Sequence, residues 1–213
     1  MDSSQSLDTR DARFPLLRGR PWRRGTARAI SAIISPPILL FGVVLVITRA
    51  TGLRVAWDWA GVYLAVAVGI PTLYFARLYR RGAVSDLDIS VRSERLRPMF
   101  VTLGCMALGG AVLWLGDAPR LQSIWVTILW VELALVWLIT QRWKISIHGA
   151  AVATTVTMLF SVFGPIALVT APAVPIVAWS RVHLLRHTLA QTVAGALLGG
   201  VTVFAMLRLL ARV

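Results

Sequence analysis

The chain has 213 residues, of which 57% are hydrophobic and 15% are charged, and its formal net charge is +13. A mean hydropathy of +0.74 excludes an ordinary soluble domain and indicates an integral membrane protein. The apolar runs lack the alternating pattern of transmembrane β-strands, so we expect an all-α, polytopic membrane helix bundle.

The N-terminal segment, residues 1–27, is polar and rich in arginine, and we expect a disordered cytosolic tail there. One transmembrane domain is then expected over residues 28–213. The first apolar run comes too late, and is too long, for a cleaved signal peptide. A basic segment beside a membrane is expected to contact anionic lipid headgroups, and we do not expect nucleic-acid binding despite the positive charge.

Apolar runs of about 20 residues can cross a bilayer core as helices, and the sequence predicts six to seven of them. In chain order these runs are Ile30–Ile47, Trp57–Phe75, Met99–Leu115, Leu121–Ile139, Gly149–Val169, Pro172–Trp179 with its continuation, and Leu189–Leu210. The sixth run is short and carries two prolines, so a half-span is the alternative there.

Basic residues divide unequally between the two sides of this bundle. Of the 22 lysines and arginines, the side opposite the N-terminus receives only Arg49, Arg54, Arg120, Arg208 and Arg212. The positive-inside rule therefore places the N-terminus and the polar stretches described next in the cytoplasm, which implies an inner (plasma) membrane of bacterial type. The sequence indicates no oligomeric state.

Three polar stretches on this predicted cytoplasmic side carry all three histidines and the only lysine. The first stretch, residues 80–98, contains Arg92 and Arg95, which share a side if the segment is helical. Planar guanidinium groups suit phosphate oxygens, although a basic loop that only fixes topology is the alternative. The second stretch, residues 142–148, contains Lys144 and His148.

The third stretch, residues 180–191, has the most informative spacing. His187 and Gln191 are four residues apart, so on a helix they share a face, and Gln191 could hydrogen-bond the ring and fix its tautomer. Ser180-Arg181, five residues, His187, three residues and Gln191 together resemble the third motif of the type 2 phosphatidic acid phosphatase (PAP2) superfamily. In that family the last position is Asp.

The other two family motifs are matched in part. The segment 145–148 is similar to the second motif, Pro-Ser-Gly-His, and keeps its serine and histidine as Ser146 and His148. The first motif of the family is Lys, six residues, Arg-Pro; Arg97 with Pro98 fits its end, which leaves Ser90 at the lysine position. The alternative alignment uses Arg95 as the arginine and puts Asp88 at the lysine position.

The resemblance implies a PAP2-like fold and a phosphatase that acts on lipids. His187 would be the nucleophile that forms a phosphohistidine, His148 the general acid, and Gln191 the residue that orients His187. The phosphate would be bound by Arg92, Arg95, Arg97, Lys144, Ser146, Ser180 and Arg181. The substrate would be a phosphomonoester or diphosphate on an isoprenoid or phosphatidyl lipid. The resemblance implies no metal or other cofactor.

Departures from the family pattern leave a second interpretation open. Gln191 cannot offset the charge of a developing imidazolium as aspartate would, so the alternative is a non-catalytic lipid-phosphate binding or carrier protein of the same fold. Glu132 in the fourth run could neutralise an arginine, bond an imidazole, relay protons in a transporter or make a helix contact. His183 with His187 could form part of a metal site, but few carboxylates or thiolates lie near them in the sequence.

Overall fold

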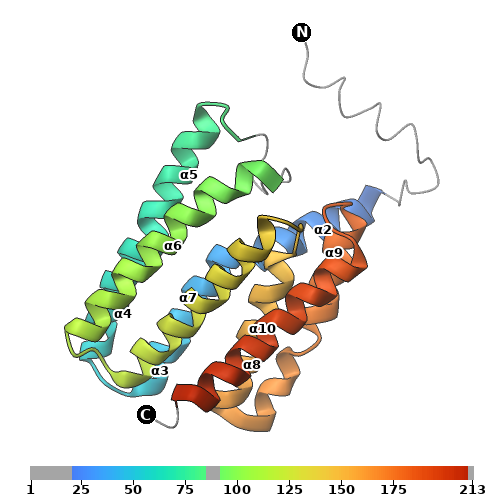
Figure 1. Cartoon of the computed structure of the whole chain (residues 1–213). Coiled ribbons are helices and arrows are strands. Elements are labelled where there is room, and N and C mark those ends of the chain that lie inside the picture. Colours follow the sequence, from blue (N-terminus) through green and yellow to red (C-terminus); the bar gives the residue numbers. More distant parts are fainter. Residues whose placement is uncertain (1–20, 85–91, 211–213) are drawn as a thin grey trace.

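The computed structural model of the chain describes residues 21–84 and 92–210, and every regular element within these ranges is a helix (Figure 1). The α-helices are α2 (Pro21–Ile33), α3 (Pro36–Thr51), α4 (Val55–Leu64), α5 (Ile70–Arg80), α6 (Arg92–Leu115), α7 (Arg120–Thr140), α8 (Ile147–Phe163), α9 (Ala173–His183) and α10 (Leu189–Leu210). A π-helical turn, Ala65–Gly69, joins α4 to α5, and a 3₁₀ segment, Gly164–Thr170, follows α8.

The prediction of an all-α, multi-pass membrane protein is confirmed by the lengths and hydropathies of these helices. Five helical segments are long and apolar enough to cross a membrane, and a sixth span results if the bent pair α2–α3 is counted as one. A count of seven is wrong for the described residues. The predicted sixth run forms α9, whose 11 residues rise only about 16 Å, roughly half of a bilayer core.

The first predicted run, Ile30–Ile47, is broken in the structure. Helix α2 ends at Ile33, and α3 starts at Pro36 after the extended residue Ser35, with a bend of 44° between the helices. Two consecutive prolines lack the amide hydrogens that a continuous helix would need, so they begin a new helix instead. Residues 21–27, assigned to the tail from the sequence, belong to α2, whereas residues 1–20 lie outside the described residues.

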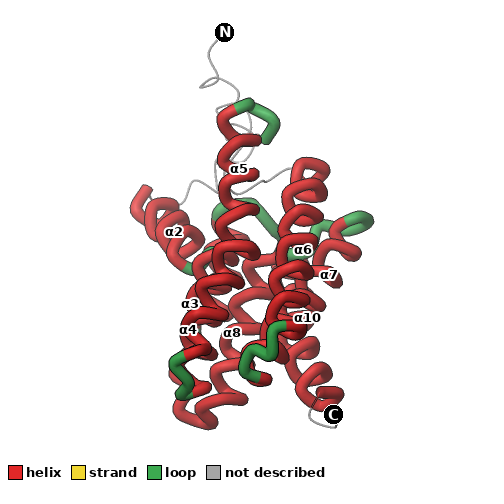
Figure 2. Tube along the Cα trace, turned by 90° about the vertical axis from the view of Figure 1, so that its left-hand side faces the viewer, coloured by secondary structure: helices red, strands yellow, loops and turns green. Residues whose placement is uncertain are grey.

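The helices run roughly parallel to one long axis, and their connections gather at two ends (Figures 1 and 2). The upper end in Figure 1 holds α2 and the α7–α8 and α9–α10 connections. The lower end holds the α3–α4 and α6–α7 connections. The main apolar core lies between α3, α4, α6 and α7, and a smaller cluster around Met99, Val136, Ile145 and Ala150 lies towards the upper end.

Glycines bring α8 and α10 into unusually close contact. A Cβ atom added to Gly149 would lie 2.7 Å from the carbonyl oxygen of Thr192. Added at Gly195 or Gly199, it would overlap the carbonyl oxygen of Ser146 or Ala150. Small residues at such positions allow the backbones of membrane helices to approach each other. This contact fixes the start of α8 beside the start of α10.

Candidate phosphate site

The turn between α9 and α10 explains the spacing of Arg181 and His187. Leu185 adopts a left-handed conformation with φ of 56°. The Arg186 amide then donates to the Arg181 carbonyl oxygen at 3.0 Å, and the Leu185 amide donates to Val182 at 2.9 Å. These two bonds form the Schellman motif that ends many helices, here with leucine where glycine is usual. The His187 amide also donates to Arg181, at 3.3 Å, so both residues belong to one hydrogen-bonded turn.

His187 is held in one tautomer by Gln191. Its Nδ1 lies 3.1 Å from Gln191 Oε1, and the same oxygen accepts the Thr188 amide at 3.2 Å. An atom that accepts a backbone N–H must be the amide oxygen, so His187 Nδ1 carries the hydrogen and donates it. The lone pair is then on Nε2, which is buried and has no hydrogen-bond partner among the described residues. The predicted hydrogen bond between His187 and Gln191 is present, although His187 lies in the turn before α10 and not on a helix as the prediction assumed.

The His187 ring is neutral near pH 7. Burial is the main factor that lowers its pKa, to about 3, because it disfavours the charged ring. The cations Arg95, Arg181 and Lys144 lower the pKa further, whereas the hydrogen bond to Gln191 raises it. A neutral imidazole with a free lone pair on Nε2 has the form that a nucleophile needs.

His148 lies in the first turn of α8, facing the same cations. Its ring is 6% exposed, and neither ring nitrogen has a hydrogen-bond partner within the described part of the chain. The guanidinium groups of Arg181 and Arg95 both act electrostatically on this ring. The backbone of Ser31 in α2 also approaches it. Since Arg95 and Arg181 act on both histidines, these four side chains form one cluster, which we call the cationic pocket.

Of the three arginines predicted near the first motif, the structure places Arg95 beside the two histidines. Arg95, on the first turn of α6, is 5% exposed and faces the pocket, and Arg181 is completely buried. Arg97 is exposed and is not among the cations acting on either ring. The side chain of Arg92 lies outside the described residues. Asp88, the alternative match to the motif lysine, lies outside them too.

Both predicted serines are buried and support the local structure. Ser146 is the N-cap of α8, where its Oγ accepts the Gly149 amide at 3.2 Å, and its own amide donates to the Gln191 carbonyl oxygen at 3.2 Å. Ser180 Oγ donates to the carbonyl oxygen of Ala27 in α2 at 2.9 Å. The Ser146 hydroxyl therefore caps α8 beside His148, and the Ser180 hydroxyl joins α9 to α2 beside Arg181.

Ser31 was missed by the sequence reasoning. Its Oγ accepts a short hydrogen bond from Arg181 Nη1, and its side chain is 4% exposed. The available signal was the pair of small residues Ala27 and Ser31, four apart, which form the buried face of α2. Assignment of residues 1–27 to a disordered tail concealed that pattern.

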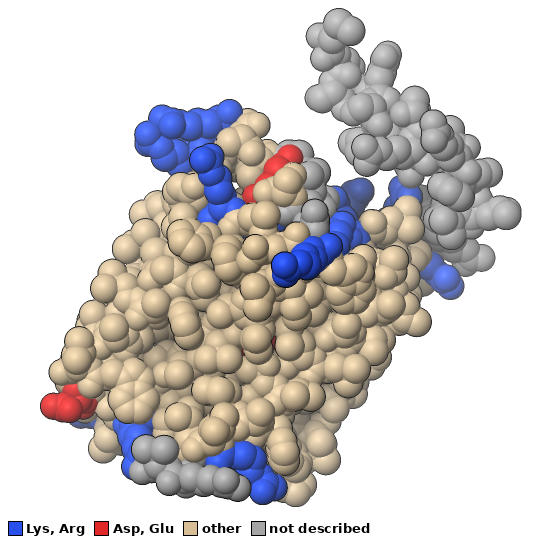
Figure 3. Space-filling view, in the orientation of Figure 1, with Lys and Arg blue, Asp and Glu red and all other residues tan. Residues whose placement is uncertain are grey.

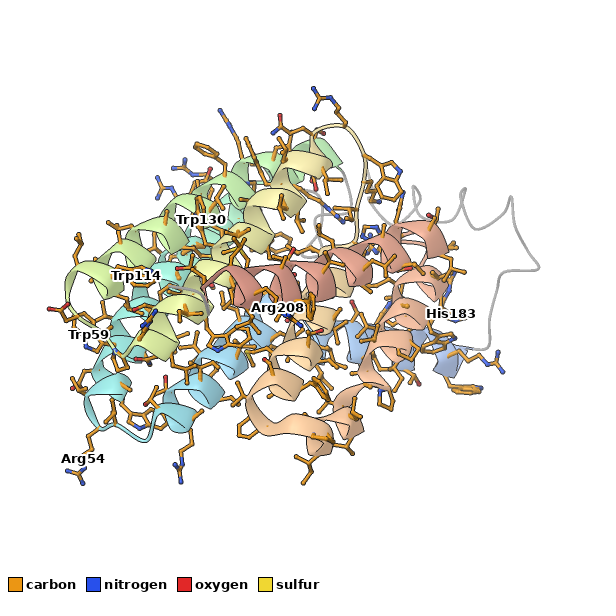
Figure 4. All side chains as sticks on the ribbon, turned by 60° about the horizontal axis from the view of Figure 1, so that its bottom comes forward. Arg54, Trp59, Trp114, Trp130, His183 and Arg208 are labelled. Carbon is orange, nitrogen blue, oxygen red and sulfur yellow. The ribbon has the colours of Figure 1, made fainter. Side chains whose placement is uncertain are left out.

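Two other candidate residues lie apart from the pocket. His183 stacks on Trp179 with ring centroids 5.2 Å apart, beside the last turn of α9 (Figure 4). Glu132, in the middle of α7, is 6% exposed and interacts with Thr154 of α8, and it is not among the charged groups acting on either pocket histidine. Within residues 21–84 and 92–210, no three His, Cys, Asp or Glu side chains are grouped to hold a metal ion.

Two cavities occur elsewhere in the bundle. One of about 10 Å³, enough for a single water molecule, lies in the main core beside Tyr63 and Gln122. A wider one of about 230 Å³ opens at the opposite end, between Arg49, Arg54 and Trp57. Neither cavity contains a pocket histidine. The His148 and His187 side chains are each only 6% exposed, so the cationic pocket is shielded from solvent.

No known family model, curated protein or solved structure matches this chain. Two buried imidazoles and two buried guanidinium groups can bind an anion with several oxygen atoms. One imidazole presents an unprotonated nitrogen, and the other has no hydrogen-bond partner among the described residues.

Proposed function

We propose that the chain is an integral membrane phosphatase that removes phosphate from a lipid phosphate or diphosphate. The observation that carries this proposal is the pocket in which Arg95 and Arg181 both act on His148 and His187. Among the described residues, the charged groups acting on the two rings are all cations, so the pocket is suited to an anion. A site at the end of a membrane bundle suits a substrate whose apolar tail stays in the bilayer.

In the proposed reaction, His187 Nε2 attacks phosphorus and the bond from phosphorus to the lipid oxygen breaks. His148, protonated once the bound phosphate offsets the two guanidinium charges, gives a proton to the leaving lipid oxygen. Water then attacks the phosphohistidine with His148 as base, releasing phosphate and restoring His187. Arg95 and Arg181 stabilise the charge on the transferring phosphoryl group throughout.

Gln191 favours a second candidate, a non-catalytic lipid-phosphate binding or carrier protein. Its neutral amide orients His187 but supplies no charge to stabilise an imidazolium. The same pocket could then hold a phosphate without transferring it. The resemblance to PAP2 phosphatases over three ordered segments supports the catalytic candidate.

Phosphate release from a panel of lipid phosphates by purified, reconstituted protein separates the two candidates. We expect release by the wild type and its loss in His187→Ala, with His183→Ala as the matched control because His183 stacks on Trp179 and is not among the groups acting on the His148 and His187 rings. Full activity in His187→Ala would exclude the proposed nucleophile. Tight binding of a lipid phosphate without any release would establish the binding protein instead.

We also propose that the pocket faces the cytoplasm, because basic side chains concentrate at this end (Figure 3). Cysteine labelling in intact cells tests this, in a background where Cys105 has been replaced. Ala83→Cys and Leu53→Cys place exposed thiols near the pocket end and at the opposite end, respectively. We expect external labelling only of the thiol at position 53, and the reverse pattern would overturn the orientation.

A further inference from the structure

Helix α2 has two faces with different chemistry. Ala27 and Ser31 are buried on one face, with exposed fractions of 0% and 4%. Arg23, Arg28 and the indole of Trp22 are exposed on the rest of the helix. The sequence of α2 contains no acidic residue. An amphipathic helix with arginine and tryptophan outside is typical of helices that lie in the headgroup region of a membrane.

The buried face of α2 forms one wall of the phosphate pocket. Ser31 accepts from Arg181 Nη1, and Ala27 accepts from Ser180, the neighbour of Arg181. The Ser31 backbone approaches the His148 ring. The position of α2 therefore affects the placement of Arg181 and His148 in the pocket.

Helix α2 is held to the bundle through α9, by packing and by the hydrogen bonds from Ser180 and Arg181. It packs mainly on α9, and a 44° bend at residues 34–35 separates it from α3, which leaves it diverging from the bundle axis (Figures 1 and 2). Ile33, at its last turn, is 67% exposed. The outer face of α2 is thus available to a membrane surface, and basic side chains are visible on this side of the upper rim (Figure 3).

We propose that α2 is a membrane-seated wall of the phosphate pocket: its arginines bind anionic lipid headgroups, and this binding holds Ser31 and Ala27 against Arg181 and Ser180. The inference rests on the proposed phosphate-binding role of the pocket. Anionic lipid around the protein thereby becomes an activator that acts through α2, separate from the substrate that enters the pocket.

Hydrogen–deuterium exchange tests the seating of α2 directly. The full chain is placed in nanodiscs of phosphatidylcholine, with or without phosphatidylglycerol, and exchange is followed over residues 22–33 and 181–187. Each arginine near an anionic surface contributes about fivefold to binding. We expect phosphatidylglycerol to slow exchange severalfold in both segments, and to raise phosphate release in the same nanodiscs.

Paired variants locate the effect. Arg23→Gln/Arg28→Gln is expected to abolish the response to phosphatidylglycerol. Arg77→Gln/Arg80→Gln is expected to retain it, because these exposed arginines lie at the same end on α5, which packs on α6. In the Ser31→Ala variant, phosphatidylglycerol should still slow exchange in α2 but should no longer slow it in residues 181–187. A purely structural role of α2 would not separate the two segments in this way.

The results separate this inference from the proposed function. The proposed role of α2 is wrong if phosphatidylglycerol does not change the exchange rate, or if both double variants lose the response equally. This holds even if phosphate is released. Exchange that responds as expected, without release in any nanodisc, supports the seating of α2 and overturns the phosphatase.

Discussion

Gln191→Glu is the most informative single change to the pocket, because it adds a charge without changing the shape of the side chain. Gln191 Oε1 accepts hydrogen bonds from His187 Nδ1 at 3.1 Å and from the Thr188 amide at 3.2 Å. A glutamate oxygen in the same place can accept both bonds. The variant therefore keeps the His187 tautomer and supplies the negative charge that the PAP2 motif would supply through aspartate.

The size of the effect follows from the distance between the charges. With the carboxylate and imidazolium centres about 4 Å apart and an effective dielectric of about 20, their attraction is about 4 kcal/mol. Gln191 is half-buried, and solvent screening reduces this by roughly half, to about 2 kcal/mol. If the full imidazolium charge develops in the transition state, the rate of phosphoryl transfer to His187 rises about thirtyfold. The same attraction raises the pKa of His187 above its present value of about 3.

Single-turnover formation of the phosphoenzyme from a labelled lipid phosphate measures this rate, and NMR titration of the ring measures the pKa. Gln141→Glu is the matched control, since it adds the same charge at an exposed position at the same end of the bundle. A properly folded Gln191→Glu protein whose His187 pKa rises while its single-turnover rate falls or stays unchanged would refute His187 as the nucleophile.

Four further outcomes are expected from other parts of the structure. Leu185→Gly should raise the melting temperature, because glycine avoids about 1 kcal/mol of left-handed strain at φ 56°, whereas Leu185→Val should lower it. Gly195→Ala should cost about 3 kcal/mol in thermal unfolding because a Cβ meets the α8 backbone, whereas Gly200→Ala, with its nearest contact at 3.6 Å, should cost little. Glu132→Gln should leave both phosphate release and stability unchanged. A variant that is equally stable but no longer releases phosphate would show that Glu132 has a role in function. His187 has a pKa of about 3 in the folded protein and 6.5 as a free side chain. Its stabilising contribution is therefore complete above pH 6.5 and is lost as the pH falls towards 3. The His187→Ala variant should accordingly lose less thermal stability than the wild type over that pH range.

The membrane spans could be predicted because continuous apolar length dominates the choice of structure in a bilayer. Five predicted runs, beginning with Trp57–Phe75 and Met99–Leu115, correspond to helical spans in the structure, apart from shifts of their ends. The break between α2 and α3 could have been suspected from Pro36 and Pro37. It was missed because the hydropathy of the run stays high across the break.

Only part of the candidate site could be predicted from the sequence. The spacing from Arg181 to His187 and Gln191 describes one local turn, so it could be recognised without knowledge of the fold. The choice between Arg95 and Arg97 depends on which side of the first turns of α6 is directed towards the two histidines, and the sequence left this open. Ser31 is 150 residues from Arg181 in the chain, and no local pattern connects two such distant residues.

The hydrogen bonds from Arg181 to Ser31 and from Ser180 to Ala27 also affect how the protein is made. A chain emerging from the ribosome at about 5–20 residues per second inserts α3 to α8 well before the partners of α2 exist. Helix α2 must wait at the membrane surface for roughly 10 seconds or more until α9 arrives. The pocket is therefore among the last parts to assemble, and a chain truncated before α9 would insert its first spans without ever forming it.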